Sequence, residues 1–199
     1  MANTNAPFGF RQWSGTGSAP TYEQVPGLIN YNTANIFFGD PVAHLSDGSL
    51  AGITTSALPG TVPLAGIFVG CKYLSVSQKR TVWSNYWPGS DVASTNQAEA
   101  YIVNDPNTQF LVQSSGGSGV TQAMVGQNLQ FAYGTGNTST GISGAYVDAA
   151  TADRTVTTLP FKVVSLVTPV GSSSPTTGQY NTVVVAFNNV ETKVTTAAP

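Results

Sequence analysis

The stretch "LAGIFVGCKYLSV" (64–76) is the strongest candidate for a core strand in this chain. It is an apolar run rich in aliphatic and aromatic residues, and such a run favours a buried β-strand. The polar turn "SQKR" (77–80) follows, and the chain returns through "TVWSNYW" (81–87). The pattern predicts two adjacent strands joined by a tight turn.

The same alternation of short apolar runs and turn residues extends along the rest of the chain. The runs are separated by glycine, by proline and by the turn sequences Asp-Gly and Asp-Pro-Asn. This pattern predicts an all-β protein, either a sandwich or a barrel. Residues 121–133 fit either a short helix or a strand. Three further hairpins are predicted: 41–53 around Asp47-Gly48, "EAYIVND" with "TQFLVQS" around Asp105-Pro106-Asn107, and "FKVVSLVTPV" with "NTVVVAFNNV".

Length and charge set the limits on function. A chain of 199 residues can form one domain with a sizeable core. Only 8% of its residues are charged, compared with about 25% in an average soluble domain. The formal net charge is −2, and the basic residues are dispersed, which argues against nucleic acid and against an anionic membrane as partners. The chain shows no secretory signal and no apolar run of membrane-spanning length, so we expect a product of the cytoplasm.

The first 28 residues form a segment of a different kind. They are rich in Pro, Gly, Asn and Ser and follow neither a helical nor a strand period, yet they carry several aromatic residues. We therefore expect an extended, irregular N-terminal arm over 1–28 and a β-sandwich domain over 29–199. An arm of this kind can bind another protein through its aromatic side chains, or it can fold back on its own sandwich. The candidate partner-binding residues are Phe8, Phe10, Arg11, Trp13 and Tyr22.

Catalytic and metal-binding patterns are sparse. His44 is the only histidine, and its neighbours Asp40 and Asp47 fit a hairpin better than a catalytic triad. The single cysteine, Cys71, lies in an apolar run and is expected to be buried. Asp105 and Asp148, like the aspartates near His44, sit in turn-like surroundings where a carboxylate caps the backbone. We predict no enzyme activity, no cofactor and no metal.

A cluster of aromatic residues in "VWSNYWPG" (82–89) is the second candidate site. Trp83, Tyr86 and Trp87 could form a platform for stacking a sugar or for binding a protein. Alternatively, these side chains fill one end of the sandwich core. The sequence leaves both interpretations open.

Several short motifs occur in an order that is similar to a known family. They are "NAPFGFR", "GD" at 39–40, "GIFVGCKY", "YWPG", "AYIVNDPNTQFLVQ", "VGQN" and "GTGNTSTGIS" followed by "YVD". Together, from Asn5 to about Val164, they resemble the capsid decoration (cement) proteins of tailed bacteriophages.

That resemblance implies a jelly-roll-like β-sandwich on the outer surface of the virion capsid, made in the host bacterial cytoplasm. Its partners would be the major capsid protein and further copies of itself, as a homodimer or homotrimer, and its task would be to bridge neighbouring capsid subunits. The alternative is a carbohydrate- or receptor-binding β-sandwich on the virion surface. On the first hypothesis, deleting residues 2–24 should leave a folded core that no longer binds capsids.

Overall fold

The computed structural model describes residues 3–14, 23–53, 63–93, 97–168 and 176–193. Within these ranges the chain is built from antiparallel β-sheets and two short 3₁₀ turns, η1 (Gln122–Met124) and η2 (Glu191–Lys193). The sheets pack in a sandwich-like arrangement, so the predicted all-β sandwich is confirmed. The finer jelly-roll connectivity stays a prediction.

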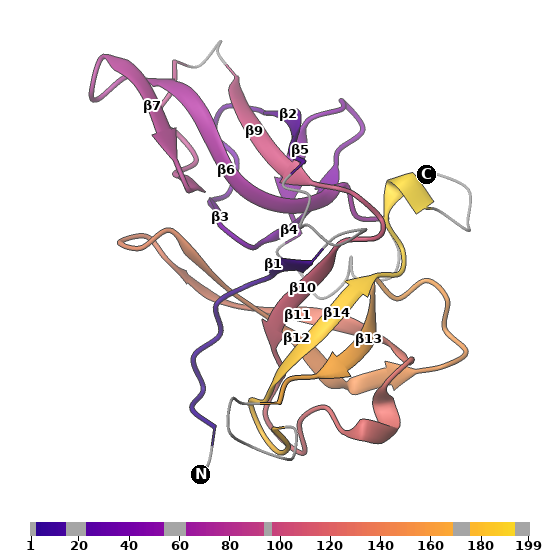
Figure 1. Cartoon of the computed structure of the whole chain (residues 1–199). Coiled ribbons are helices and arrows are strands. Elements are labelled where there is room, and N and C mark those ends of the chain that lie inside the picture. The colour runs from indigo at the N-terminus through magenta and orange to yellow at the C-terminus, as the bar shows by residue number, and fades with distance from the viewer. Residues whose placement is uncertain (1–2, 15–22, 54–62, 94–96, 169–175, 194–199) are drawn as a thin grey trace.

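The first sheet has six strands and contains mostly the second half of the chain (Figure 1). Its one early strand is β1, which occupies an edge and pairs with β10. In spatial order the strands are β1 (Arg11–Ser14), β10 (Gln109–Gln113), β14 (Thr182–Phe187), β13 (Phe161–Leu166), β11 (Asn128–Asn137) and β12 (Ile142–Asp153).

The second sheet is formed by the first half of the chain, and a small ribbon lies beside it (Figure 1). Strand β6 is its longest member and pairs with β9, β4 and β7. The strands are β2 (Val25–Ile29), β9 (Ala98–Val103), β6 (Gly66–Ser75), β4 (Pro41–His44) and β5 (Leu50–Gly52), with β7 (Arg80–Ser84) beside β6; the ribbon is β3 (Ile36–Phe37) with β8 (Tyr86–Trp87).

Two apolar clusters hold these layers together. The larger joins the first sheet to residues of the second, among them Ile67 and Val103. The smaller lies on the second sheet, where Phe68 and Ile102 pack with Ile36 and Trp87 of the small ribbon. Ile67 and Phe68 are consecutive on β6, so the second sheet is apolar on both faces: one packs in the larger cluster and the other in the smaller.

Three of the predicted hairpins are confirmed. Strands β4 and β5 pair around Asp47-Gly48, and Gly48 has a φ of 78°, which explains the glycine at this turn. Strands β6 and β7 pair, as do β13 and β14. The undecided segment 121–133 contains both the 3₁₀ turn η1 and the first half of β11.

The predicted hairpin of 99–105 with 108–114 is wrong. The turn itself forms, because Asp105 Oδ1 accepts a hydrogen bond from the amide of Asn107 at 2.9 Å. However, β9 pairs with β2 and β6 in the second sheet, whereas β10 pairs with β1 and β14 in the first. This turn therefore carries the chain from one sheet to the other.

Candidate functional site

The N-terminal segment is less irregular than the sequence predicts. Residues 11–14 form β1, and residues 25–29 form β2, so the expected boundary between 28 and 29 falls inside a strand. Gln113 holds the start of the segment, since its side chain accepts a hydrogen bond from the amide of Ala6 at 3.0 Å and donates one to the carbonyl of Thr4 at 2.9 Å. The described part of the arm thus lies on its own sandwich.

Phe10 is the residue that fixes this segment in place. Its ring is 1% exposed and stacks on Phe161, with the ring centroids 4.3 Å apart. Phe110 and Phe131 contact it edge-on. The prediction that Phe10 binds a partner is therefore corrected, because its ring belongs to the main core. Deletion of 2–24 would remove a core side chain, so the expectation of an intact truncated core is corrected as well.

Gly9 explains why the chain can enter the core at this point. Its φ is +72°, and a Cβ atom here would lie 2.7 Å from Cβ of Ser143 and 3.0 Å from the carbonyl oxygen of Gly39. Glycine is the residue that tolerates both this backbone conformation and this close approach. The amide of Phe10 then donates to the carbonyl of Gly39 at 3.0 Å, which joins the segment to the connection between β3 and β4.

The remaining arm candidates divide into exposed and partly exposed residues. Trp13 lies on β1 and is 56% exposed. Arg11, on the same strand, is also exposed, and its guanidinium carbon lies 5.1 Å from the ring centroid of the half-buried Phe8. Tyr22 lies outside the described residues. Because β1 ends its sheet and pairs with β10 among the strands described, these side chains lie at the edge of that sheet.

The aromatic cluster of 82–89 does not form one platform. Trp87 is buried in the smaller core, where its indole nitrogen donates to Thr33 at 2.8 Å, so its assignment as a sugar-stacking residue is corrected. Tyr86 is half-buried and stacks on Phe37. Trp83 alone is largely exposed, at 68%. The strand is interrupted at Asn85, between β7 and β8, and the two tryptophans point to opposite sides of the second sheet.

Trp83 forms a platform with residues that the sequence did not single out. Its ring lies nearly parallel to that of Tyr101, with an interplanar angle of 10° and centroids 5.7 Å apart. The ammonium of Lys72 lies 5.2 Å from the Trp83 ring centroid and 3.1 Å from a carboxylate oxygen of Glu99. That ion pair raises the pKa of Lys72 and lowers the pKa of Glu99, so both groups stay charged at neutral pH.

The strand register brings these four side chains onto one face. Lys72 of β6 lies opposite both Trp83 of β7 and Glu99 of β9, and Tyr101 lies opposite Gly70. Alternation along β6 and the opposite charges on neighbouring strands are the signals that could have revealed the group. Using them requires the pairing of β6 with β9, which no local turn encodes.

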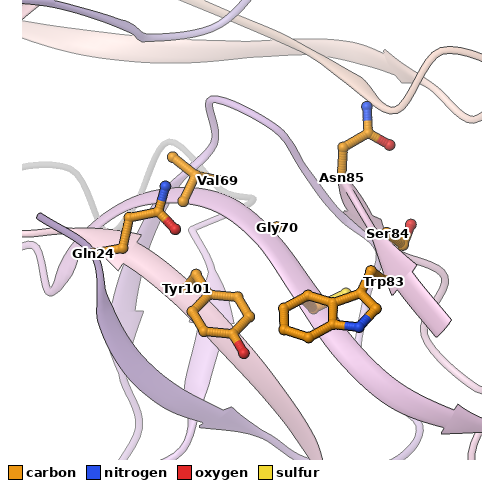
Figure 2. A pocket seen from close by; sticks show the side chains of 8 residues that line it. Gln24, Val69, Gly70, Trp83, Ser84, Asn85 and Tyr101 are labelled. Carbon is orange, nitrogen blue, oxygen red and sulfur yellow. The ribbon is translucent and has the colours of Figure 1, made fainter. Parts of the chain in front are cut away.

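A shallow cavity of about 340 Å³ opens over this face (Figure 2). Trp83 and Tyr101 lie side by side in it, and Gln24 and Asn85 stand at its rim. Cys71 also lines the cavity, but burial raises the pKa of its thiol to about 12, so the thiolate nucleophile does not form at neutral pH. The arrangement can bind a ligand and offers no cysteine nucleophile to react with it.

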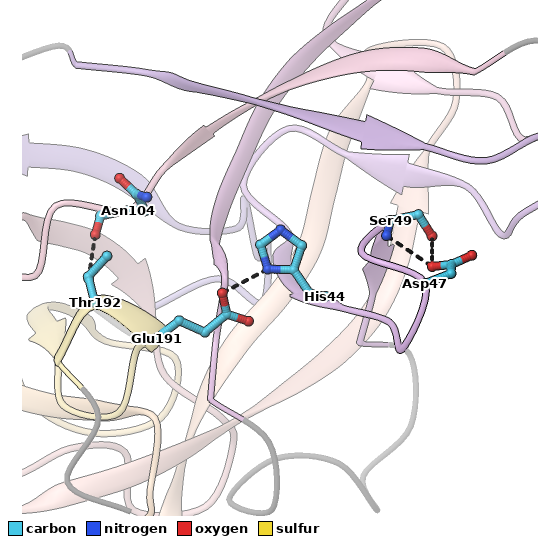
Figure 3. Close-up of polar contacts among 6 residues, drawn as sticks. All are labelled: His44, Asp47, Ser49, Asn104, Glu191 and Thr192. Carbon is cyan, nitrogen blue, oxygen red and sulfur yellow. Dashed lines mark hydrogen bonds and ion pairs between the residues drawn. The ribbon is translucent and has the colours of Figure 1, made fainter. Parts of the chain in front are cut away.

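The hypothesis of a catalytic triad at His44 can be compared with the contacts of this side chain (Figure 3). Its Nδ1 lies 2.7 Å from a carboxylate oxygen of Glu191. Asp47 accepts hydrogen bonds from both the amide and the hydroxyl of Ser49, at 2.9 and 2.7 Å, and thus caps its own turn as predicted. Asp40 is buried elsewhere and bonds to Ser143. His44 is therefore paired with a residue that the triad hypothesis did not include, and the absence of enzyme activity stays a prediction.

No metal-binding group, membrane-spanning helix or similar known protein assigns a function to the described part of the chain. Within the described ranges, no group of three or more His, Cys, Asp or Glu side chains is placed to hold a metal ion. No helix in that part of the chain has the length and apolar character needed to cross a bilayer. Comparison of the chain with models of known families, with curated proteins and with solved structures found no significant match.

Proposed function

We propose that this chain is a decoration (cement) protein that binds the outer surface of a tailed-phage capsid and bridges adjacent major capsid protein subunits. The proposal includes synthesis in the host bacterial cytoplasm and self-association as a homodimer or homotrimer. The order of the short motifs resembles that family, and the all-β sandwich suits it. The low charge supports contacts that depend little on salt.

The observation that carries the proposal is the edge strand β1. The segment before it is anchored by the buried Phe10, and β10 pairs with the strand, so its backbone is held in place within the protein itself. Trp13 and Arg11 project from it into solvent. An ordered strand edge that carries an exposed tryptophan and arginine can pair with a strand of a capsid subunit, and these residue types are enriched among binding hot spots.

Replacing Trp13 with alanine should lower the affinity for capsids at least about tenfold, because a hot-spot aromatic residue would be lost. Purified heads that lack the protein are incubated with increasing concentrations of recombinant protein, and the bound fraction is measured by co-sedimentation. Trp83→Ala is the matched control, since it removes a tryptophan from the other sheet that is also more than half exposed. Full occupancy by the Trp13 variant at the wild-type concentration would contradict the proposed contact.

The alternative function, carbohydrate or receptor binding, is favoured by a different surface. Trp83 and Tyr101 present exposed ring area beside polar side chains, as sugar-binding sites do. The number of copies on the particle separates the two main roles. Hundreds of copies distributed over the head indicate cement, whereas a few copies at the tail indicate an adhesin.

A further inference from the structure

We infer that the cavity over Trp83 and Tyr101 is a binding site for a neutral sugar residue, a function additional to capsid attachment. The aromatic floor is the first argument. The two rings are nearly parallel, at 10°, and lie side by side in the cavity (Figure 2). A pyranose ring has one flat face of C–H groups, and a flat, exposed aromatic surface is the complement to that face.

The position of the rings is fixed before any ligand arrives. The ammonium of Lys72 lies 5.2 Å from the Trp83 ring centroid, and Gly70, which lines the cavity, lies opposite Tyr101 in the register. A Cβ atom at position 70 would lie 3.0 Å from the carbonyl oxygen of Ser84, so a larger residue would crowd the backbone that carries Trp83. A site that is already ordered loses little side-chain entropy on binding.

The rim supplies hydrogen-bonding groups without net charge. Gln24 and Asn85 carry amides, which both donate and accept hydrogen bonds, as sugar hydroxyls do. Asn85 is oriented by a 2.7 Å hydrogen bond from its amide nitrogen to the carbonyl of Thr140. Amides at the edge of an aromatic floor match a ligand that has hydroxyl groups around an apolar face.

The charges next to the cavity select against an ionic ligand. The ammonium of Lys72 and the carboxylate of Glu99 lie 3.1 Å apart and compensate each other. Because the pair carries no net charge, it offers no electrostatic gain to an anionic or a cationic sugar unless it is broken. Together, the paired groups can still donate to one hydroxyl and accept from its neighbour, so a neutral hexose or N-acetylhexosamine is the class that fits.

The test uses the full-length protein and β-1,4-linked tetrasaccharides of glucose and of N-acetylglucosamine, with maltotetraose and free galactose and mannose as further probes. Binding is followed by intrinsic fluorescence and by calorimetry. We expect saturable binding of at least one neutral sugar with a Kd below about 10 mM. Trp83→Ala should weaken it at least tenfold, Trp83→Phe should retain part of it, and Trp13→Ala should leave it within about twofold of wild type.

Three results would overturn the inference. They are no saturable binding by any of these sugars, equal binding by the Trp83→Ala variant, and tighter binding of a sulfated heparin tetrasaccharide than of the neutral sugars. In the second case, loss of capsid occupancy in the same variant would assign this face to the capsid. Because Trp13→Ala tests capsid attachment and Trp83→Ala tests the sugar site, failure of one leaves the other measurable.

Discussion

Replacing Phe10 with alanine is expected to lower the free energy of unfolding by about 3–5 kcal/mol, the usual cost of removing a buried phenylalanine ring. The ring is 1% exposed and is surrounded by three other phenylalanine rings, of which Phe161 is the closest at 4.3 Å between centroids. The smaller side chain would leave a cavity between the two sheets. Urea unfolding followed by intrinsic fluorescence measures the change.

Phe8→Ala is the matched control for this experiment, two residues earlier in the same segment. Phe8 is only half-buried, and its charged neighbour is the guanidinium of Arg11, 5.1 Å from the ring centroid. We expect this variant to lower the free energy of unfolding by about 1 kcal/mol or less. A loss for Phe10→Ala as small as that for Phe8→Ala would mean that the segment does not enter the core in solution, and the arm would then be free to bind elsewhere.

The comparison of Phe10 with Trp13 shows what the sequence could not decide. Both are aromatic and stand three residues apart in the same segment rich in Pro, Gly, Asn and Ser, yet one is in the core and the other is exposed. The choice depends on a gap between Phe110, Phe131 and Phe161, which come from distant parts of the chain. The local hint was Gly9, because a glycine between two phenylalanines permits a close approach of backbones.

Short turn motifs predicted the structure correctly where the paired strands are neighbours in the sequence. Asp47-Gly48 predicts a turn, and the strands on both sides pair with each other. Asp105-Pro106-Asn107 also predicts a turn, but its flanking strands go to different sheets. A turn fixes the reversal of the chain, whereas the choice of strand partner is determined by which apolar faces are buried together. The same limit applies to the sugar site, because Tyr101 meets Trp83 only through the pairing of β9 with β6.

Asp40 shows the same dependence on distant contacts, because it joins the two sheets through a buried carboxylate. It lies just before β4 and is 3% exposed. Its Oδ2 accepts a hydrogen bond from the amide of Phe37 at 2.7 Å, and its Oδ1 accepts one from the hydroxyl of Ser143 on β12 at 2.5 Å. Burial raises the pKa of Asp40 from 3.8 to about 6, although both hydrogen bonds act to lower it. The cost of burying the charge therefore exceeds the gain from its partners.

We expect this carboxyl group to make the protein less stable as the pH rises through its titration. The folded state holds the proton up to about pH 6, whereas the unfolded state releases it near 3.8, so folded molecules bind more protons in between. The free energy of unfolding then falls with increasing pH across this window, by up to about 3 kcal/mol in total. The stabilising contribution of the protonated Asp40 carboxyl group is fully present below pH 3.8 and is lost above about pH 6.

The Asp40→Asn variant isolates this effect. Asparagine cannot ionise, so the difference in unfolding free energy between wild type and variant should shift by up to about 3 kcal/mol between pH 3.8 and 6 and stay constant above that window. Loss of a hydrogen bond to Ser143 or Phe37 shifts the curve of unfolding free energy against pH for the variant by a constant amount. It does not change how the difference between the two curves varies with pH. Asp47→Asn is the control, because bonds to Ser49 lower the pKa of Asp47 and its pH dependence has the opposite sign. Parallel curves for wild type and Asp40→Asn would show that the carboxylate is not desolvated at this junction.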